Sequence, residues 1–183
     1  MTPADMFDRT FASAIQDRRD LVRFLEGVST TQAQWHPPDG EWSILEGLEH
    51  IMLTEEFFRV NLLKVVKNAE ASDTWDNVPP QPAKMSPEAL RRREQGFVAA
   101  PDVLVPRSDG NLQDMRAALL SAREATREAL FPYRFKDMSR LLLPHPRYGD
   151  RNVYDVIEYS GIHDYLHHEQ MQRVTRQPGY PPH

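Results

Sequence analysis

The sequence predicts an all-α fold in which long helices pack side by side as a bundle. Its 15 prolines gather mainly in four connections, and since proline costs about 3 kcal/mol inside a helix, long helices must fall between them. Apolar residues recur in these intervals at three- or four-residue spacing, as on one face of a helix. No segment alternates apolar and polar residues over a useful length, so we expect no strands. The four intervals are residues 4–36, 39–78, 107–131 and 147–177.

The first two long helices have recognisable boundaries. The first is expected over residues 4–26, where the apolar spacing is regular apart from a polar turn at residues 18–19. The second is expected over residues 44–68, directly after Ser43. Ser43 and Glu46 match a capping box, in which the hydroxyl accepts from a free backbone N–H and the glutamate reaches back to the cap residue. The length of the second helix is typical of a bundle.

The third and fourth long helices follow the same pattern. We expect them over residues 109–131 and 152–175, with Asp150 or Asn152 as the cap of the fourth. A short extra helix is predicted at residues 86–90 within the long connection, because a serine cap is followed there by proline in the first turn.

Composition and charge limit the classes of function. The chain has 183 residues, 40% hydrophobic and 27% charged, as expected of one globular domain over residues 1–183. Its 22 Lys and Arg against 27 Asp and Glu give a net charge of −5, and no stretch concentrates basic residues, which argues against a nucleic-acid partner. Cysteine is absent, so any metal must be held by His, Asp or Glu.

Targeting signals are not evident in the sequence. The first ten residues carry Asp5 and Asp8 without the apolar run of a signal peptide. No apolar run approaches the roughly 18 residues needed to cross a bilayer. We therefore expect a cytoplasmic protein without a membrane partner.

Two histidines one helical turn apart are the main chemical signal. His163 and His167 are separated by four positions, so their side chains share one face of the fourth helix. That face also carries apolar residues and should point into the bundle, where an unpaired polar group costs roughly 1–3 kcal/mol. A divalent metal ion would satisfy both imidazoles, and His50 on the second helix is the candidate third ligand.

Three imidazoles around a divalent ion would leave coordination positions for water or substrate, as in catalytic sites. The ion could be zinc, nickel, iron or manganese. Gly47 and Gly161 sit within a turn of His50 and His163, where a missing side chain would let two backbones approach closely. Histidine pairs at this spacing also occur in ordinary cores and surfaces, so an interpretation without metal stays open.

Other polar residues near the three histidines could support chemistry. Glu49 and Gln170 are candidate catalytic helpers, and Glu46 is a second candidate proton acceptor. Asp164 and Glu169 flank the histidines and are expected to form a solvated or interhelical face, or else to orient an imidazole.

The remaining four histidines are not expected to be ligands. His168 is rotated by about 100° from His167 on a helix and should leave the ligand face. His145 lies between two prolines in an expected loop, and His36 and His183 are expected to be exposed.

Two segments resemble a known family. Residues 41–50 (EWSILEGLEH) resemble the W-s-i-x-e-x-l-x-H segment of DinB/YfiT-like proteins. Residues 149–153 (GDRNV) and 163–170 (HDYLHHEQ) resemble the final-helix signature H-D-x-x-H-x-x-Q. The resemblance implies an up-down-down-up bundle of four helices, usually dimeric, with a divalent metal held by three histidines. Those ligands would be His50, His163 and His167 here.

The resemblance also suggests an activity. Characterised relatives include thiol S-transferases and isomerases that use low-molecular-weight thiols such as bacillithiol, mycothiol or glutathione. We therefore expect a metal-dependent transferase that delivers a metal-bound thiolate or water to a small electrophilic substrate. A metal-dependent hydrolase and a non-enzymatic binding bundle with a structural metal are the alternatives. The proline-rich connection at residues 73–106 departs from the family and could rebuild the mouth of the site.

Overall fold

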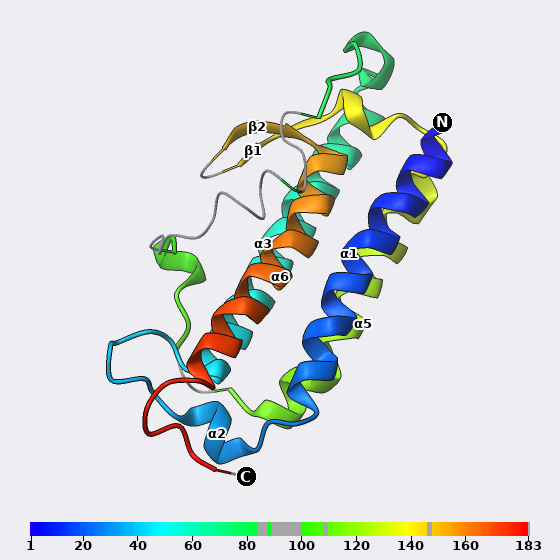
Figure 1. Ribbon diagram of the computed structural model, residues 1–183. Coiled ribbons are helices and arrows are strands. Elements are labelled where there is room, and N and C mark those ends of the chain that lie inside the picture. The colour runs from blue at the N-terminus through cyan, green and yellow to red at the C-terminus, as the bar shows by residue number, and fades with distance from the viewer. Residues whose placement is uncertain (84–87, 89–99, 108–109, 146–147, 183) are drawn as a thin grey trace.

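The computed structural model describes residues 1–83, 88, 100–107, 110–145 and 148–182. Most of these residues lie in helices (Figure 1), which confirms the predicted helical class. The α-helices are α1 Pro3–Leu25, α2 Thr30–Gln34, α3 Ile44–Ala71, α5 Leu112–Leu130 and α6 Val153–Val174. Single turns of 3-10 helix are η1 Trp75–Asn77, η2 Asp102–Leu104, η3 Phe131–Tyr133 and η4 Met138–Arg140.

The long helices α1, α3, α5 and α6 lie side by side. Both α1 and α3 pack against α5 and α6. The colours of Figure 1 show that α1 and α6 run in one direction and that α3 and α5 run in the other. Residues from four distant parts of the sequence therefore meet in the interior between these helices.

The starts of α1, α3 and α6 lie within one residue of the predicted ones because capping side chains set them, whereas α5 begins at Leu112 and not at residue 109. The backbone N–H of Glu46 donates to Ser43 Oγ at 3.2 Å, and the N–H of Ser43 donates to Glu46 Oε2 at 2.8 Å, which confirms the capping box. Asn152, not Asp150, caps α6. Thr2 and Asn111 cap α1 and α5.

The end of α3 lies beyond the predicted residue 68, at Ala71. Residues 68–72 contain no glycine or proline that would end the helix earlier. Asp73 then adopts a left-handed φ of 51°. The N–H of Thr74 then donates to Ala69 O at 3.2 Å, which satisfies a carbonyl of the last turn. The helix therefore ends by backbone hydrogen bonding without the usual sequence signal.

The two glycines near the histidines differ in what their missing side chains allow. A Cβ on Gly161 would lie 2.7 Å from the Cα of Ala14, so α1 and α6 approach closely there, as predicted. A Cβ on Gly47 would instead lie 2.8 Å from the terminal methyl of Met171. The expected close backbone approach at Gly47 is therefore wrong, because a side chain fills that space.

A short antiparallel hairpin precedes α6, so the expectation of no strands is wrong. Strands β1 Leu142–His145 and β2 Gly149–Asn152 pair in the register Leu142 to Asn152 and His145 to Gly149. Each strand has four residues, too few for a clear alternating pattern. The first strand also contains a proline, a residue that had suggested a loop. The hairpin leads directly into Asn152, the cap of α6.

The apolar core consists of two clusters along the long helices. The first occupies the end at which α1 and α6 begin, and includes Phe7, Phe11, Phe58, Val66, Leu130, Val156 and Ile162. The second occupies the other end, and includes Leu21, Leu25, Leu48, Ile51, Leu119, Met171 and Val174. On every long helix one buried charged residue separates the two clusters: Arg18, Glu55, Arg123 and Asp164. The core is thus divided by a charged layer to which each long helix contributes.

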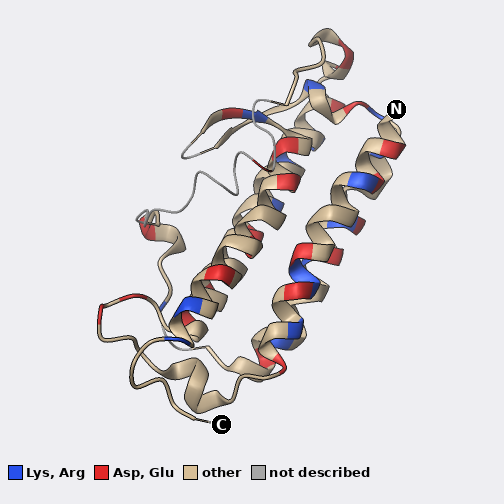
Figure 2. Cartoon of the chain, in the orientation of Figure 1, with Lys and Arg blue, Asp and Glu red and all other residues tan. Residues whose placement is uncertain are grey.

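The predicted helix at residues 86–90 lies, apart from Glu88, outside the described residues. Among the helices that are described, none combines the length and apolar character of a membrane span. Figure 2 shows acidic and basic residues interspersed along these helices, in keeping with the mixed charge of the sequence.

Candidate metal centre

The three predicted ligands come together between α3 and α6. The Nε2 atom of His163 lies 3.1 Å from Nε2 of His50 and 3.2 Å from Nε2 of His167. His50 comes from the first turns of α3, and the other two from adjacent turns of α6. The ligand atoms of all three lie within 4.8 Å of one another, in the arrangement expected of a metal-binding group.

The outer nitrogens of two of these rings have fixed partners. Nδ1 of His50 lies 2.7 Å from the carbonyl oxygen of Leu104, and Nδ1 of His167 lies 2.8 Å from Oε1 of Gln170. An oxygen of either kind only accepts, so each Nδ1 carries the proton and donates it. In the neutral rings Nε2 then carries a lone pair, and both lone pairs are directed toward His163.

Burial keeps these imidazoles neutral. His50 is 5% exposed and His163 is 9% exposed. Burial lowers the pKa of His50, and burial followed by the charges of His167 and His50 lowers the pKa of His163 well below its usual value. Burial, together with His50, lowers the pKa of His167 to about 3. Neutral imidazole is the form that binds a metal ion.

The donor set fits a divalent ion. Nitrogens placed 2.0–2.1 Å from zinc at tetrahedral angles are about 3.3 Å apart, close to the two separations observed here. Without an ion, His163 can donate to only one of its neighbours, which leaves another buried lone pair facing nitrogen. A cation would satisfy all three Nε2 atoms together.

Two aromatic rings, those of Trp42 and Tyr159, lie beside the cluster. The ring centroid of Trp42 lies 5.0 Å from that of His50. The same indole ring stacks on the His167 ring, with the two centroids 6.3 Å apart and an interplanar angle of 19°. Tyr159 lies 5.9 Å from His163 on the preceding turn of α6. These rings lower the local polarity and so strengthen electrostatic interactions with a bound ion.

The candidate helpers have defined contacts. Gln170 holds His167, as described above. Glu49 is buried, and its Oε1 accepts the backbone N–H of Arg107 at 2.8 Å. Glu46 Oε2 accepts the backbone N–H of Ser43 at the cap of α3. The same oxygen lies 3.2 Å from Nε2 of the exposed His36. Both carboxylates proposed as proton acceptors are therefore hydrogen-bonded to backbone N–H groups.

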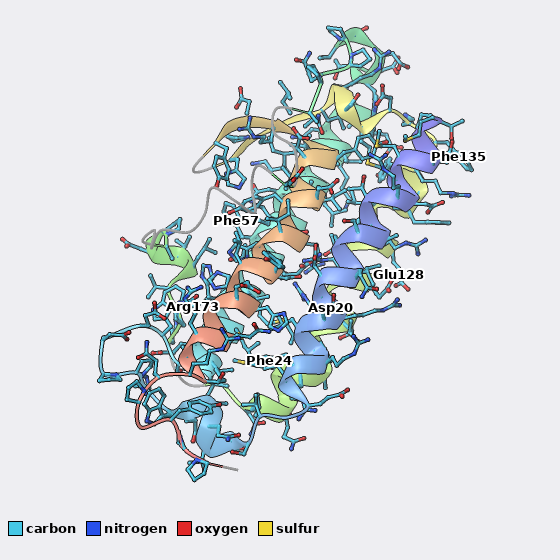
Figure 3. The ribbon with its side chains drawn as sticks, in the orientation of Figure 1. Asp20, Phe24, Phe57, Glu128, Phe135 and Arg173 are labelled. Carbon is cyan, nitrogen blue, oxygen red and sulfur yellow. The ribbon has the colours of Figure 1, made fainter. Side chains whose placement is uncertain are left out.

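The other histidines lie outside the cluster. His168 leaves the ligand face, as predicted: its Nε2 lies 3.0 Å from Gln172 Nε2, and its ring lies 5.0 Å from that of Phe24. Figure 3 shows Phe24 between α1 and α6. His145 is buried in β1 against the rings of Tyr148 and Tyr159, which corrects the expected loop position. His183 lies outside the described residues.

The charged layer behind His163 was not predicted from the sequence. Asp164 was expected to lie on either a solvated or an interhelical face, and the structure places it, buried, on the interhelical one. It forms ion pairs with Arg18 and Arg123. Glu55 accepts from the same two arginines at 3.1 and 2.8 Å, and from Thr126 Oγ1 at 2.6 Å. The available signal was a charged residue interrupting each apolar face, as Arg18 does in the polar turn of the first helix.

A comparison with known protein families gives a match for most of the chain. The model of the DinB superfamily matches residues 14–171, a span that includes all three clustered histidines. The chain belongs to the DinB superfamily. This assignment confirms the resemblance drawn from segments 41–50 and 163–170. The chain is also similar to the uncharacterized protein YuaE of Bacillus subtilis (strain 168), which is 26% identical over 151 residues, or 82% of this chain and 87% of YuaE. No solved structure matches the chain significantly.

Proposed function

We propose that this DinB-superfamily protein is a divalent-metal-dependent enzyme of the thiol S-transferase type, with His50, His163 and His167 as its metal ligands. The observation that carries the proposal is the convergence of three Nε2 atoms, of which two have lone pairs fixed by hydrogen bonds at Nδ1. The candidate ions are zinc, nickel, iron and manganese, of which zinc, nickel and iron are well suited to imidazole ligands.

A divalent ion in this position would act as a Lewis acid and lower the pKa of a thiol or water that it binds. The chain supplies orientation and exclusion of water. Leu104 and Gln170 fix two imidazole rings, and Trp42 covers the cluster beside them. Three protein ligands would leave room for a small molecule, which is the arrangement of catalytic sites.

Thiol transfer is favoured over hydrolysis by the contacts of the nearby carboxylates. A hydrolase needs a general base within reach of its water. Glu46 and Glu49 already accept backbone N–H groups, so one carboxylate oxygen of each is engaged by the backbone. A thiol whose pKa the metal lowers needs less help from such a base.

The proposal extends to the organisation of the protein. Residues 1–183 would form one domain of up-down-down-up topology, supported by the helix directions in Figure 1. Exposed apolar side chains such as Val60 and Phe135 offer surface for a homodimer, which sizing combined with light scattering would test. We also propose a cytoplasmic location, because small thiols are kept reduced there.

Metal analysis of protein purified without a nickel column tests the first part of the proposal. We expect about one divalent ion per chain in the wild type, and loss of most of it in the double variant His163→Ala/His167→Ala. The loaded protein should then consume a low-molecular-weight thiol together with a small electrophile. Turnover without thiol would indicate hydrolysis, and full metal loading of the double variant would contradict the ligand assignment.

A further inference from the structure

A short segment of the proline-rich connection lies against the metal centre. Residues 101–107, here called the strap, contain the turn η2 and contact α3. The strap is ordered by its own hydrogen bonds, from Leu104 N–H to Pro101 O at 2.8 Å and from Val105 N–H to Asp102 O at 3.3 Å. Prolines at both of its ends restrict the backbone further.

Leu104 and two hydrogen bonds hold the strap against α3. Of its three apolar side chains besides proline, Leu104 is 7% exposed, whereas Val103 is 72% and Val105 is 43% exposed. Two hydrogen bonds join it to neighbouring residues of α3: Nδ1 of His50 donates to Leu104 O, and the N–H of Arg107 donates to Glu49 Oε1. Both α3 residues are buried.

The first of these bonds connects the strap to a candidate metal ligand. The carbonyl of Leu104 fixes the proton of His50 on Nδ1 and thereby directs the Nε2 lone pair into the cluster. The second bond, from Arg107 to Glu49, holds the strap to the residue that precedes His50 on α3. Glu49 thus holds Arg107, and Leu104 of the same strap contacts His50, so the strap links Glu49 to the ring of His50.

We propose that Glu49 is a positioning residue, that it anchors the strap over His50, and that docking of the strap and metal binding strengthen each other. This inference rests on the proposed function, because it takes His50 as a metal ligand. An ion on Nε2 makes the Nδ1 proton more acidic and so tightens its hydrogen bond to Leu104. By thermodynamic linkage, a docked strap must then raise the affinity for the metal by the same factor.

The test measures zinc affinity by competition with a chromophoric chelator, and amide hydrogen exchange in residues 101–107 with and without zinc. In the wild type, zinc should slow exchange in the strap. Glu49→Leu removes the acceptor and should weaken zinc binding by about tenfold or more, the usual effect of losing an outer partner of a metal ligand. Glu49→Gln retains an acceptor oxygen and should bind zinc nearly as the wild type does.

Two further variants separate the strap from a general effect on α3. Arg107→Pro removes the same hydrogen bond from the strap side without changing α3, and it should weaken zinc binding as Glu49→Leu does. Glu56→Leu, at a 56% exposed position on α3, is the matched control and should change neither measurement. Strap exchange that does not respond to zinc, or zinc affinity that survives in either Glu49→Leu or Arg107→Pro, would overturn the inference.

The proposed function fails in a different way. If the wild type binds no zinc, or binds it equally well after His50→Ala, the ligand assignment is wrong and the inference falls with it. If zinc binding depends on His50 but not on Glu49 and Arg107, the metal centre stands and only the coupling to the strap is rejected.

Discussion

Arg18 and Asp164 form a two-pronged ion pair that joins α1 to α6 next to the histidine cluster. Nε of Arg18 donates to Asp164 Oδ2 at 2.7 Å, and Nη2 donates to Oδ1 at 3.0 Å. Both residues are 1% exposed. Glu55 and Arg123 complete the charged layer, so two positive and two negative side chains balance within the core. Since Asp164 follows His163, the layer also fixes the position of α6 at the candidate ligand.

Breaking this layer at one residue should be costly. Arg18→Met leaves Asp164 and Glu55 without one of their partners, and removal of one member of a buried ion pair typically costs about 3–5 kcal/mol. Urea unfolding at neutral pH would measure the loss. Arg19→Met is the matched control, because Arg19 is the next residue on α1 and is exposed; its effect should stay within about 0.5 kcal/mol. Equal losses in the two variants would argue against the layer.

Glu55 should make the protein sensitive to acid. Burial alone would raise its pKa, but Arg123, Arg18 and the hydroxyl of Thr126 outweigh burial and hold the pKa below its ordinary value of 4.5. In the unfolded chain Glu55 therefore binds a proton at higher pH than in the folded protein. Its contribution to the free energy of unfolding is present above about pH 4.5 and is lost as pH falls through the lowered folded pKa.

The corresponding measurement is urea unfolding from pH 7 to pH 3 for the wild type and Glu55→Gln. The variant should be less stable at pH 7 and should show a shallower decline in acid, because its side chain does not titrate. Glu56→Gln, at an exposed position on the same helix, should follow the wild-type curve. A wild-type slope retained in Glu55→Gln would show that other groups cause the acid sensitivity.

The helices and the histidine cluster could be predicted because both depend on local spacing. Ser43 and Glu46 are three positions apart, and His163 and His167 are one turn apart, so each pair is defined within one helix. His50 required two helices to be neighbours, which its family segment implied. The hairpin at residues 142–152 was missed because strands of four residues carry too little pattern.

The surroundings of the site could not be predicted for a different reason. Leu104 contributes a backbone carbonyl to His50, and a carbonyl has no sequence signature. Arg18 was visible as an interruption in an apolar face, but its partners lie on three other helices. Whether such an arginine is solvated or buried depends on charges brought together only by the fold, which explains why its role appeared with the structure.

Trp42 should report metal binding directly. Its ring lies 5.0 Å from that of His50 and stacks on His167, so a paramagnetic ion such as Ni²⁺ at the cluster should quench its fluorescence. Titration of the metal-free protein should therefore show saturable quenching that Trp42→Phe removes. Trp75→Phe is the control, because Trp75 stacks on Tyr133 in the other part of the core. Quenching that persists in Trp42→Phe would place the ion elsewhere.

His50 provides the most demanding test, since it joins α3 to the histidine pair of α6 across 113 positions of sequence. His50→Ala should leave the helical circular dichroism nearly unchanged but weaken metal binding by orders of magnitude, because one of three ligands is lost. His168→Ala, which removes a neighbouring histidine outside the cluster, should bind metal as the wild type does.

The stability of the same proteins then separates a ligand from a core residue. Metal at a hundred times its dissociation constant stabilises a folded protein by about 2.7 kcal/mol, so zinc should raise the melting temperature of the wild type and of His168→Ala, but not that of His50→Ala. A chelator should remove most of the difference between wild type and His50→Ala. If the difference instead persists after chelation and metal content is unchanged, His50 stabilises the fold by packing, and the three-histidine centre reduces to a histidine pair on α6.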